Sequence, residues 1–153
     1  MVEIKRILYP IDFSECSYQV LPYVLDLAEK YEAEIYLLYV VDDLRPFAGL
    51  HVPHTSISHF VKEAMAASEK MLDKICDEHL QSCPNFQRRL IMGDPRVEIL
   101  EMVEREKMDL VIIGSHSRKG LERVIFGSVA EYVIRNASVP VLIVHPHRVK
   151  ERQ

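Results

Sequence analysis

The segment GSHSRKGLERVIFGSVAE, residues 114–131, combines residue types that suit an anionic ligand. A glycine opens it, basic side chains follow, and Gly127-Ser128 stands where a helix is predicted to begin. Backbone amides at a helix N-terminus, with the positive end of the helix dipole, attract phosphate oxygens. Ser117 lies at the centre of the loop, where a turn that holds phosphate favours glycine. The segment therefore predicts phosphate binding by a loop with one unusual residue.

The spacing of the glycines departs from the two commonest phosphate-binding motifs. Gly114 and Gly120 stand too far apart for a P-loop, and Leu121 follows the second glycine in place of lysine. The segment also lacks G-x-G-x-x-G and follows the fourth predicted strand, whereas the dinucleotide fingerprint follows the first. A P-loop ATPase, a kinase or an ordinary dehydrogenase is therefore not expected.

Other residues that can carry chemistry form weaker patterns. His51, His54 and His59 lack an i, i+4 pair on a helix, so they are interpreted as ordinary histidines and no metal site is assigned. The three cysteines lack C-x-x-C spacing and are interpreted as reduced thiols. No Ser-His-Asp, Cys-His or paired-carboxylate arrangement is evident. An enzyme is not the favoured interpretation, and no catalytic residue is assigned.

Short apolar runs alternate with helical patterns along the chain. Strands are predicted over residues 4–12, 33–42, 85–93, 108–114 and 139–146. Helices are predicted after the first four strands, the second over about 57–81, the third over 94–107 and the fourth over 128–138. A long connection, residues 42–56, holds two prolines and a glycine and is expected to be a mobile cover.

Polar residues predict where the helices begin. Ser14 or Ser17 can cap the first helix, Asp94 the third and Ser128 the fourth. Pro10 is expected to end the first strand, because proline cannot donate to a central ladder. The first helix is predicted to bury the face formed by Val20, Val24, Leu27 and Tyr31. The second is predicted to bury Val61, Met65, Ser68, Leu72, Ile75 and Leu80.

The element order βαβαβαβαβ predicts an α/β fold, a doubly wound parallel sheet of five strands with helices on both faces. Residues 1–153 are interpreted as one domain with its core at about 3–146. Ligands of such sheets bind beyond the carboxyl ends of the strands, where the winding direction reverses. If the first and fourth strands are neighbours, PIDFS and GSHS face each other across that crevice.

Composition and charge limit the classes of partner. With 48% hydrophobic and 27% charged residues, the chain has the balance of a globular protein. A net charge of -4 argues against general nucleic-acid binding, which needs a basic surface. No apolar run suits a signal peptide or a membrane span. A cytoplasmic protein is expected, with neither nucleic acid nor membrane as partner.

Three motifs in order resemble the universal stress protein family: ILYPIDFSE near the start, GSHSRKGLERVIFGSVAE in the second half and VPVLIVH near the end. The resemblance covers essentially the whole chain. It implies an adenine nucleotide α-hydrolase-like sheet in the order 3-2-1-4-5, with the switch point in the crevice inferred above.

One branch of that family binds ATP through G-x2-G-x9-G-[ST], and another branch lacks the motif and does not bind it. Gly114, Gly127 and Ser128 match the motif, and Ser117 replaces its second glycine. The resemblance therefore implies ATP or AMP as ligand, with Mg2+ or Mn2+ held mainly by the phosphates.

The resemblance also implies a role for each site residue. Asp12 and Val40 would hold the adenine. The ribose would be flanked by Pro10, Ile11 and Gly114, with Ile113 beside them. The phosphates would be lined by His116, Ser117, Gly127, Ser128 and Val129.

Simpler interpretations remain open for several of these residues. Asp12 could serve only to cap the first helix. His116 could be a surface histidine of the loop. Arg118, Lys119 and Arg123 could draw in a triphosphate, but a solvated basic face is the more usual meaning of such a run.

The favoured hypothesis is a nucleotide-binding module that acts in stress response or signalling, with at most slow ATP hydrolysis. The alternative is an interaction protein of the same fold that binds no nucleotide. A nucleotide-using enzyme is the weakest hypothesis, because no group that would activate a substrate is visible. In each case a homodimer is expected through the last strand, Val141 to His145, which is apolar and lies at a predicted sheet edge.

Overall fold

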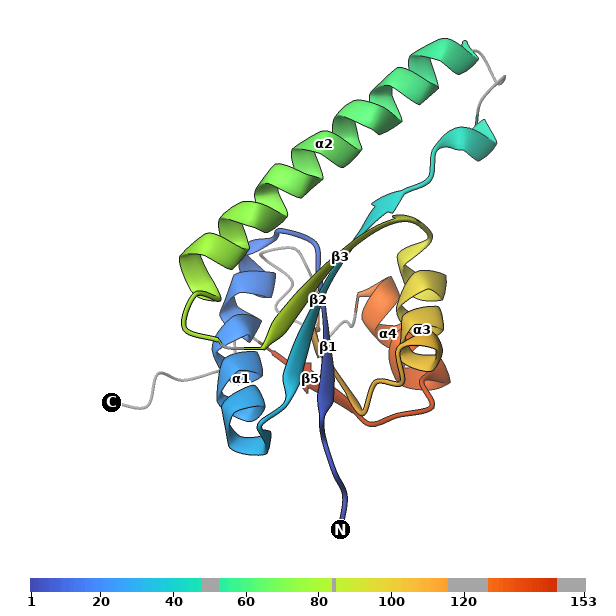
Figure 1. Ribbon diagram of the computed structural model, residues 1–153. Coiled ribbons are helices and arrows are strands. Elements are labelled where there is room, and N and C mark those ends of the chain that lie inside the picture. Colours follow the sequence, from blue (N-terminus) through green and yellow to red (C-terminus); the bar gives the residue numbers. More distant parts are fainter. Residues whose placement is uncertain (48–52, 84, 116–126, 146–153) are drawn as a thin grey trace.

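Five parallel strands form one sheet with helices on both faces (Figure 1), in a computed structural model that describes residues 1–47, 53–83, 85–115 and 127–145. The strands are β1 (Arg6–Ile11), β2 (Glu34–Asp42), β3 (Phe86–Gly93), β4 (Leu110–Gly114) and β5 (Val141–Val144). The helices are α1 (Glu15–Tyr31), the 3-10 turn η1 (Arg45–Phe47), α2 (His54–His79), α3 (Pro95–Arg105) and α4 (Ser128–Asn136). The sheet order β3-β2-β1-β4-β5 confirms the predicted class and topology.

The sheet separates two hydrophobic cores. Ile7 and Leu37 belong to the core covered by α1 and α2, and Leu8 and Leu38 to the core covered by α3 and α4 (Figure 1). All four side chains are fully buried. Successive side chains of a strand point to opposite faces, so a strand covered on both faces is apolar throughout. This explains the nearly continuous apolar run of β2.

Two of the helix starts follow the predicted caps, and one does not. The Ser14 hydroxyl accepts from the amide of Ser17 at 3.3 Å, and the Asp94 carboxylate accepts from the amide of Arg96 at 2.9 Å. The prediction that Ser128 caps the last helix is wrong. Gly127 is the N-cap of α4, without a side-chain hydrogen bond, and Ser128 is the first helical residue.

The prediction that Pro10 ends the first strand is also wrong. Pro10 lies inside β1 and is paired with Leu38 of β2. The register between β1 and β4 covers only Ile7 and Leu8. The proline therefore comes after the ladder with β4 has ended, and its missing amide hydrogen costs that ladder no bond.

Three further details differ from the sequence-based expectation. Tyr31, the last residue of α1, is 37% exposed, whereas Ala28 in the same last turn is buried. The connection after β2 is shorter than expected, since η1 occupies part of it and α2 begins at His54. Of the expected buried stripe of α2, Val61 and Met65 are half-buried and the other residues are buried.

In the described ranges, no helix has the length and hydrophobicity needed to cross a bilayer.

Candidate functional site

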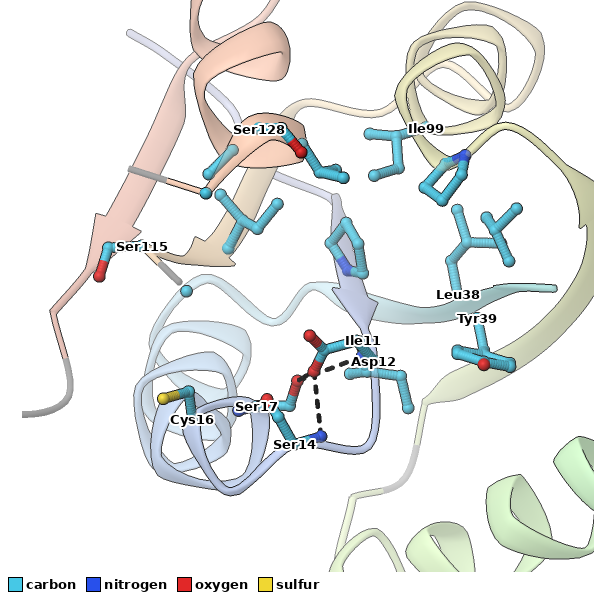
Figure 2. Close-up of a pocket in the computed structure, with 18 of the residues that line it drawn as sticks. Ile11, Asp12, Ser14, Cys16, Ser17, Leu38, Tyr39, Ile99, Ser115 and Ser128 are labelled. Carbon is cyan, nitrogen blue, oxygen red and sulfur yellow. Dashed lines mark hydrogen bonds between the residues drawn. The ribbon is translucent and has the colours of Figure 1, made fainter. Parts of the chain in front are cut away.

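A cavity of about 250 Å3 opens at the carboxyl ends of β1, β2 and β4, bordered by the first residues of α1, α3 and α4 (Figure 2). This is the crevice in which the direction of winding reverses. The predicted site residues that line it are Pro10, Ile11, Asp12, Val40, Ile113, Gly114, Gly127, Ser128 and Val129. His116 and Ser117, also predicted, fall outside the described residues, as do Arg118, Lys119 and Arg123.

The cavity also has walls that were not among the predicted site residues. Pro95 and Ile99 reach it from α3, and Leu38, Tyr39 and Asp42 from β2. A signal for Pro95 existed, because it follows the carboxyl end of β3, the same edge of the sheet as the other site loops. Ile99 carried no such signal, since an apolar residue one turn into a helix is ordinarily a core residue.

One side of the cavity is an apolar slot. Leu38 and Ile99 are almost completely buried, and Val40 and Ile113 are 8% and 7% exposed. All four belong to the core beneath α3 and α4, so packing holds the slot in shape. A slot with aliphatic walls suits a flat aromatic ring, which gains from leaving water without needing a charged partner.

The other side of the cavity is polar and centres on Asp12. Its Oδ1 atom accepts hydrogen bonds from the amide of Ser14 at 3.0 Å and from the hydroxyl of Ser17 at 2.7 Å. The Ser17 hydroxyl in turn accepts from the amide of Asp12 at 3.2 Å. Because Ser14 is the N-cap of α1, Asp12 is not the residue that caps the helix. Its exposed carboxylate faces the cavity (Figure 2).

A buried tyrosine supports this polar turn from below. The hydroxyl of Tyr9 donates a hydrogen bond to the backbone carbonyl of Ser17. Burial, with smaller contributions from the charges of Asp12 and Tyr18, raises the pKa of Tyr9 well above the usual tyrosine value. Because even the ordinary tyrosine pKa lies well above neutral pH, the hydroxyl is protonated there and donates. Tyr9 ties the first turn of α1 to the sheet.

The end of the cavity beside β4 is suited to anions. Gly127 and Ser128 bring the N-terminus of α4 to the cavity, and the Gly127 amide donates to the carbonyl of Ser115 at 2.6 Å. Amides in the first turn of a helix have no partner within the helix and can bind an anion. Gly114 also lines the cavity, and a Cβ atom there would approach Cγ2 of Val20 to 3.3 Å. A larger residue at position 114 would press against α1.

Metal ligands are sparse around this cavity. The carboxylates in its described lining are Asp12 and Asp42. Within residues 1–47, 53–83, 85–115 and 127–145, no group of three or more histidine, cysteine, aspartate or glutamate side chains could hold an ion. A divalent ion at this site would therefore need ligands from a bound phosphate chain.

Comparison with known proteins agrees with the fold and with the motifs. The model of the universal stress protein family matches residues 3–145. Universal stress protein MJ0531 of Methanocaldococcus jannaschii is 37% identical over 142 residues, which cover 92% of this chain and 81% of that protein.

Solved structures agree as well. The structure of protein MJ0577, from the same organism, superposes with a TM-score of 0.82 at 29% identity and covers 98% of this chain and 100% of that one. A universal stress protein in complex with cAMP has the same fold, with a TM-score of 0.70 at 18% identity over 94% of this chain and 98% of that one. The chain therefore belongs to the universal stress protein family.

Proposed function

We propose that this protein binds an adenine nucleotide, ATP or AMP, in the cavity at the switch point of its sheet, and that it acts in stress response as a binding module. One observation carries the proposal: an apolar slot, a carboxylate and a helix N-terminus border a single cavity of about 250 Å3. The slot and the carboxylate suit the adenine, the helix N-terminus suits the phosphates, and no catalytic group is assigned.

The adenine is proposed to occupy the apolar slot between Val40 and Ile99. Its ring would be covered by aliphatic side chains, and its amino group would donate to the carboxylate of Asp12. An ionised carboxylate can only accept hydrogen bonds, so it complements a base edge that presents a donor. The ribose would lie near Pro10, Ile11 and Gly114, between the slot and α4.

The phosphates are proposed to lie against the N-terminus of α4. Gly127 permits close approach of the backbone, and Ser128 and Val129 supply amides in the first turn. His116 and Ser117 precede this turn in the sequence and are proposed to complete the phosphate end. Mg2+ or Mn2+, when bound, would be held mainly by phosphate oxygens.

The family relationship supports a ligand of this class. A universal stress protein of the same fold has been solved in complex with cAMP, and one from Archaeoglobus fulgidus in complex with dAMP. Both are only 18% identical to this chain, so they support only the ability of this fold to bind a nucleotide of this class. The ligand positions proposed for this chain rest on the residues of its own cavity. A cytoplasmic location, where adenine nucleotides are abundant, is part of the proposal.

Native mass spectrometry of the purified protein, followed by calorimetric titration with ATP and AMP, tests the proposal. We expect a co-purified adenine nucleotide or saturable binding, and a loss of about tenfold or more in affinity for Asp12→Ala. Asp26→Ala removes an exposed carboxylate of α1 that is not part of the cavity lining, and should bind as the wild type does. The absence of any nucleotide binding would leave the interaction-protein alternative.

A further inference from the structure

Ser17 makes four hydrogen bonds at the polar side of the cavity. Its amide donates to the Ser14 hydroxyl at 3.3 Å, and its carbonyl accepts from the hydroxyl of Tyr9. Its own hydroxyl donates to Asp12 Oδ1 at 2.7 Å and accepts from the Asp12 amide at 3.2 Å. The side chain of Ser17 thus bridges both the backbone and the carboxylate of one residue.

We propose that Ser17 is a positioning residue that orients the Asp12 carboxylate and thereby sets the preference of the cavity for adenine. This inference rests on the proposed function, since it concerns how the same cavity distinguishes one base from another. Ser17 itself need not touch the nucleotide. It acts through the direction in which Asp12 presents its second oxygen.

The geometry explains why the orientation is held. An aspartate in a solvent-exposed turn can rotate about two side-chain torsions, and Asp12 is exposed. Two donors converge on Oδ1, one from the Ser14 amide and one from the Ser17 hydroxyl. Together they fix the plane of the carboxylate, which turns its other oxygen toward the cavity (Figure 2). An acceptor that is already in place loses less freedom when the ligand binds.

Ser17 is in turn held on both sides. The backbone carbonyl of Ser17 is anchored by Tyr9, which is 2% exposed and belongs to the core beneath α1 and α2. The amide is anchored by the N-cap Ser14. The hydroxyl of Ser17 therefore projects from a rigid first turn, and Asp12 is aligned with respect to the sheet.

The orientation of the Asp12 carboxylate affects which base the cavity prefers. Adenine presents an amino donor on its six-membered ring, whereas guanine presents a carbonyl acceptor at the equivalent position. An oriented carboxylate accepts from the first and repels the second. If the carboxylate could rotate freely, adenine would bind more weakly, because its amino group would lose a well-placed acceptor. A base without the amino group makes no such contact, so its affinity would change much less.

The test compares Ser17→Ala with the wild type, using ATP and purine riboside 5′-triphosphate, which lacks the amino group. We expect Ser17→Ala to weaken ATP binding about tenfold while changing the affinity for purine riboside triphosphate by less than about twofold. Ser17→Thr, which keeps the hydroxyl, should retain most of the preference for ATP. Ser138→Ala is the matched control, because it removes a hydroxyl that donates to a carboxylate oxygen, that of Glu104, outside the cavity lining; it should leave the preference unchanged.

The outcomes separate the two proposals. If the wild type binds ATP and Ser17→Ala weakens both ligands equally, Ser17 has only a structural role and the inference is overturned while the proposed function stands. If ATP binding by Ser17→Ala equals that of the wild type, the inference is likewise overturned. If the wild type binds neither ligand, the proposed function fails, and the inference fails with it. Thermal unfolding of each variant shows that the protein compared is folded.

Discussion

At the scale of single residues, Ser117 is expected to limit how tightly the proposed phosphate end binds ATP. Glycine at this motif position serves either a positive φ angle or a close approach to phosphate. If the position requires a left-handed conformation, serine costs about 1–2 kcal/mol. Its hydroxyl can recover part of this by donating to a phosphate oxygen.

We therefore predict that Ser117→Gly binds ATP about tenfold more tightly than the wild type does. Calorimetry with ATP and AMP, each with and without magnesium, measures the difference. Ser82→Gly is a suitable control, because Ser82 is exposed in the turn after α2 at the opposite end of the sheet. Equal ATP affinity of wild type and Ser117→Gly would mean that the serine fits the loop without strain.

Tyr9 is expected to make the free energy of unfolding depend on pH in the alkaline range. Its pKa is raised by burial in the folded state, so the unfolded chain ionises first, near the usual value of 10.0. The stabilising contribution is fully present below that pH and is lost as the pH rises above it. The free energy of unfolding should fall by up to about 1.4 kcal/mol per pH unit from this residue.

Tyr9→Phe tests this contribution, because it removes the titrating group and leaves the ring. The variant should lose about 1–3 kcal/mol at neutral pH, since the carbonyl of Ser17 loses its donor. It should also show a shallower decline in stability above pH 10. Burial raises the pKa of Tyr36 and Tyr39 as well, so part of the decline should remain. Chemical denaturation at several pH values between 7 and 11 gives both quantities.

At the scale of elements, the first turns of α3 contribute both to the stability of the fold and to the lining of the cavity. Asp94 caps this helix and forms an ion pair with Arg96, with Nη2 and Oδ2 at 2.7 Å. That hydrogen-bonded pair holds the pKa of Asp94 below its usual value. The cap is therefore strongest above the ordinary aspartate pKa and weakens as the pH falls through the lower folded value.

Asp94→Ala should lower the free energy of unfolding by about 1 kcal/mol at neutral pH, the usual cost of losing an N-cap. Because Pro95 and Ile99 of the same helix line the cavity, fraying of the first turn should also weaken nucleotide binding. Asp77→Ala, at an exposed position of α2, serves as the control for both measurements. A variant with unchanged stability would show that Pro95 alone starts the helix.

At the scale of the whole molecule, β5 forms one edge of the sheet. An edge strand exposes backbone donors and acceptors that invite pairing with another chain. Leu142, at this edge, is 37% exposed, whereas Val144 is 6% exposed and belongs to the core. Among the described strands, β5 is paired with β4 alone and presents an accessible apolar side chain, which suits the homodimer expected from the sequence.

We predict that Leu142→Asp shifts the protein from dimer to monomer and leaves its fold intact. Met71→Asp is the matched control, since Met71 is similarly exposed but lies on α2. Sedimentation at micromolar concentration distinguishes the two states, and circular dichroism reports the fold. A wild-type monomer in this experiment would contradict the proposed dimer. Val144→Asp should instead unfold the protein, because it places a charge in the core.

Much of the fold could be predicted from the sequence because the signals act over a few residues. The alternation of apolar strands with helical patterns predicted the parallel sheet, and its order followed from the family resemblance. Asp94 could be identified as a cap, and the first cap could be narrowed to Ser14 or Ser17, since an N-cap bonds an amide only two or three residues away. The crevice could be located because the carboxyl ends of parallel strands meet at one edge.

What only the tertiary structure decided depends on contacts between distant segments. Pro10 lies within β1 because the ladder with β4 ends at Leu8, and strand register is a property of two strands. Ile99 became a wall of the cavity only when α3 packed beside β2. Even the short link between Asp12 and Ser17 could not be predicted, because a serine one turn into a helix can equally cap it or face solvent. Periodicity and capping reveal where elements begin, whereas the direction of a side chain depends on the neighbours that the whole fold brings to it.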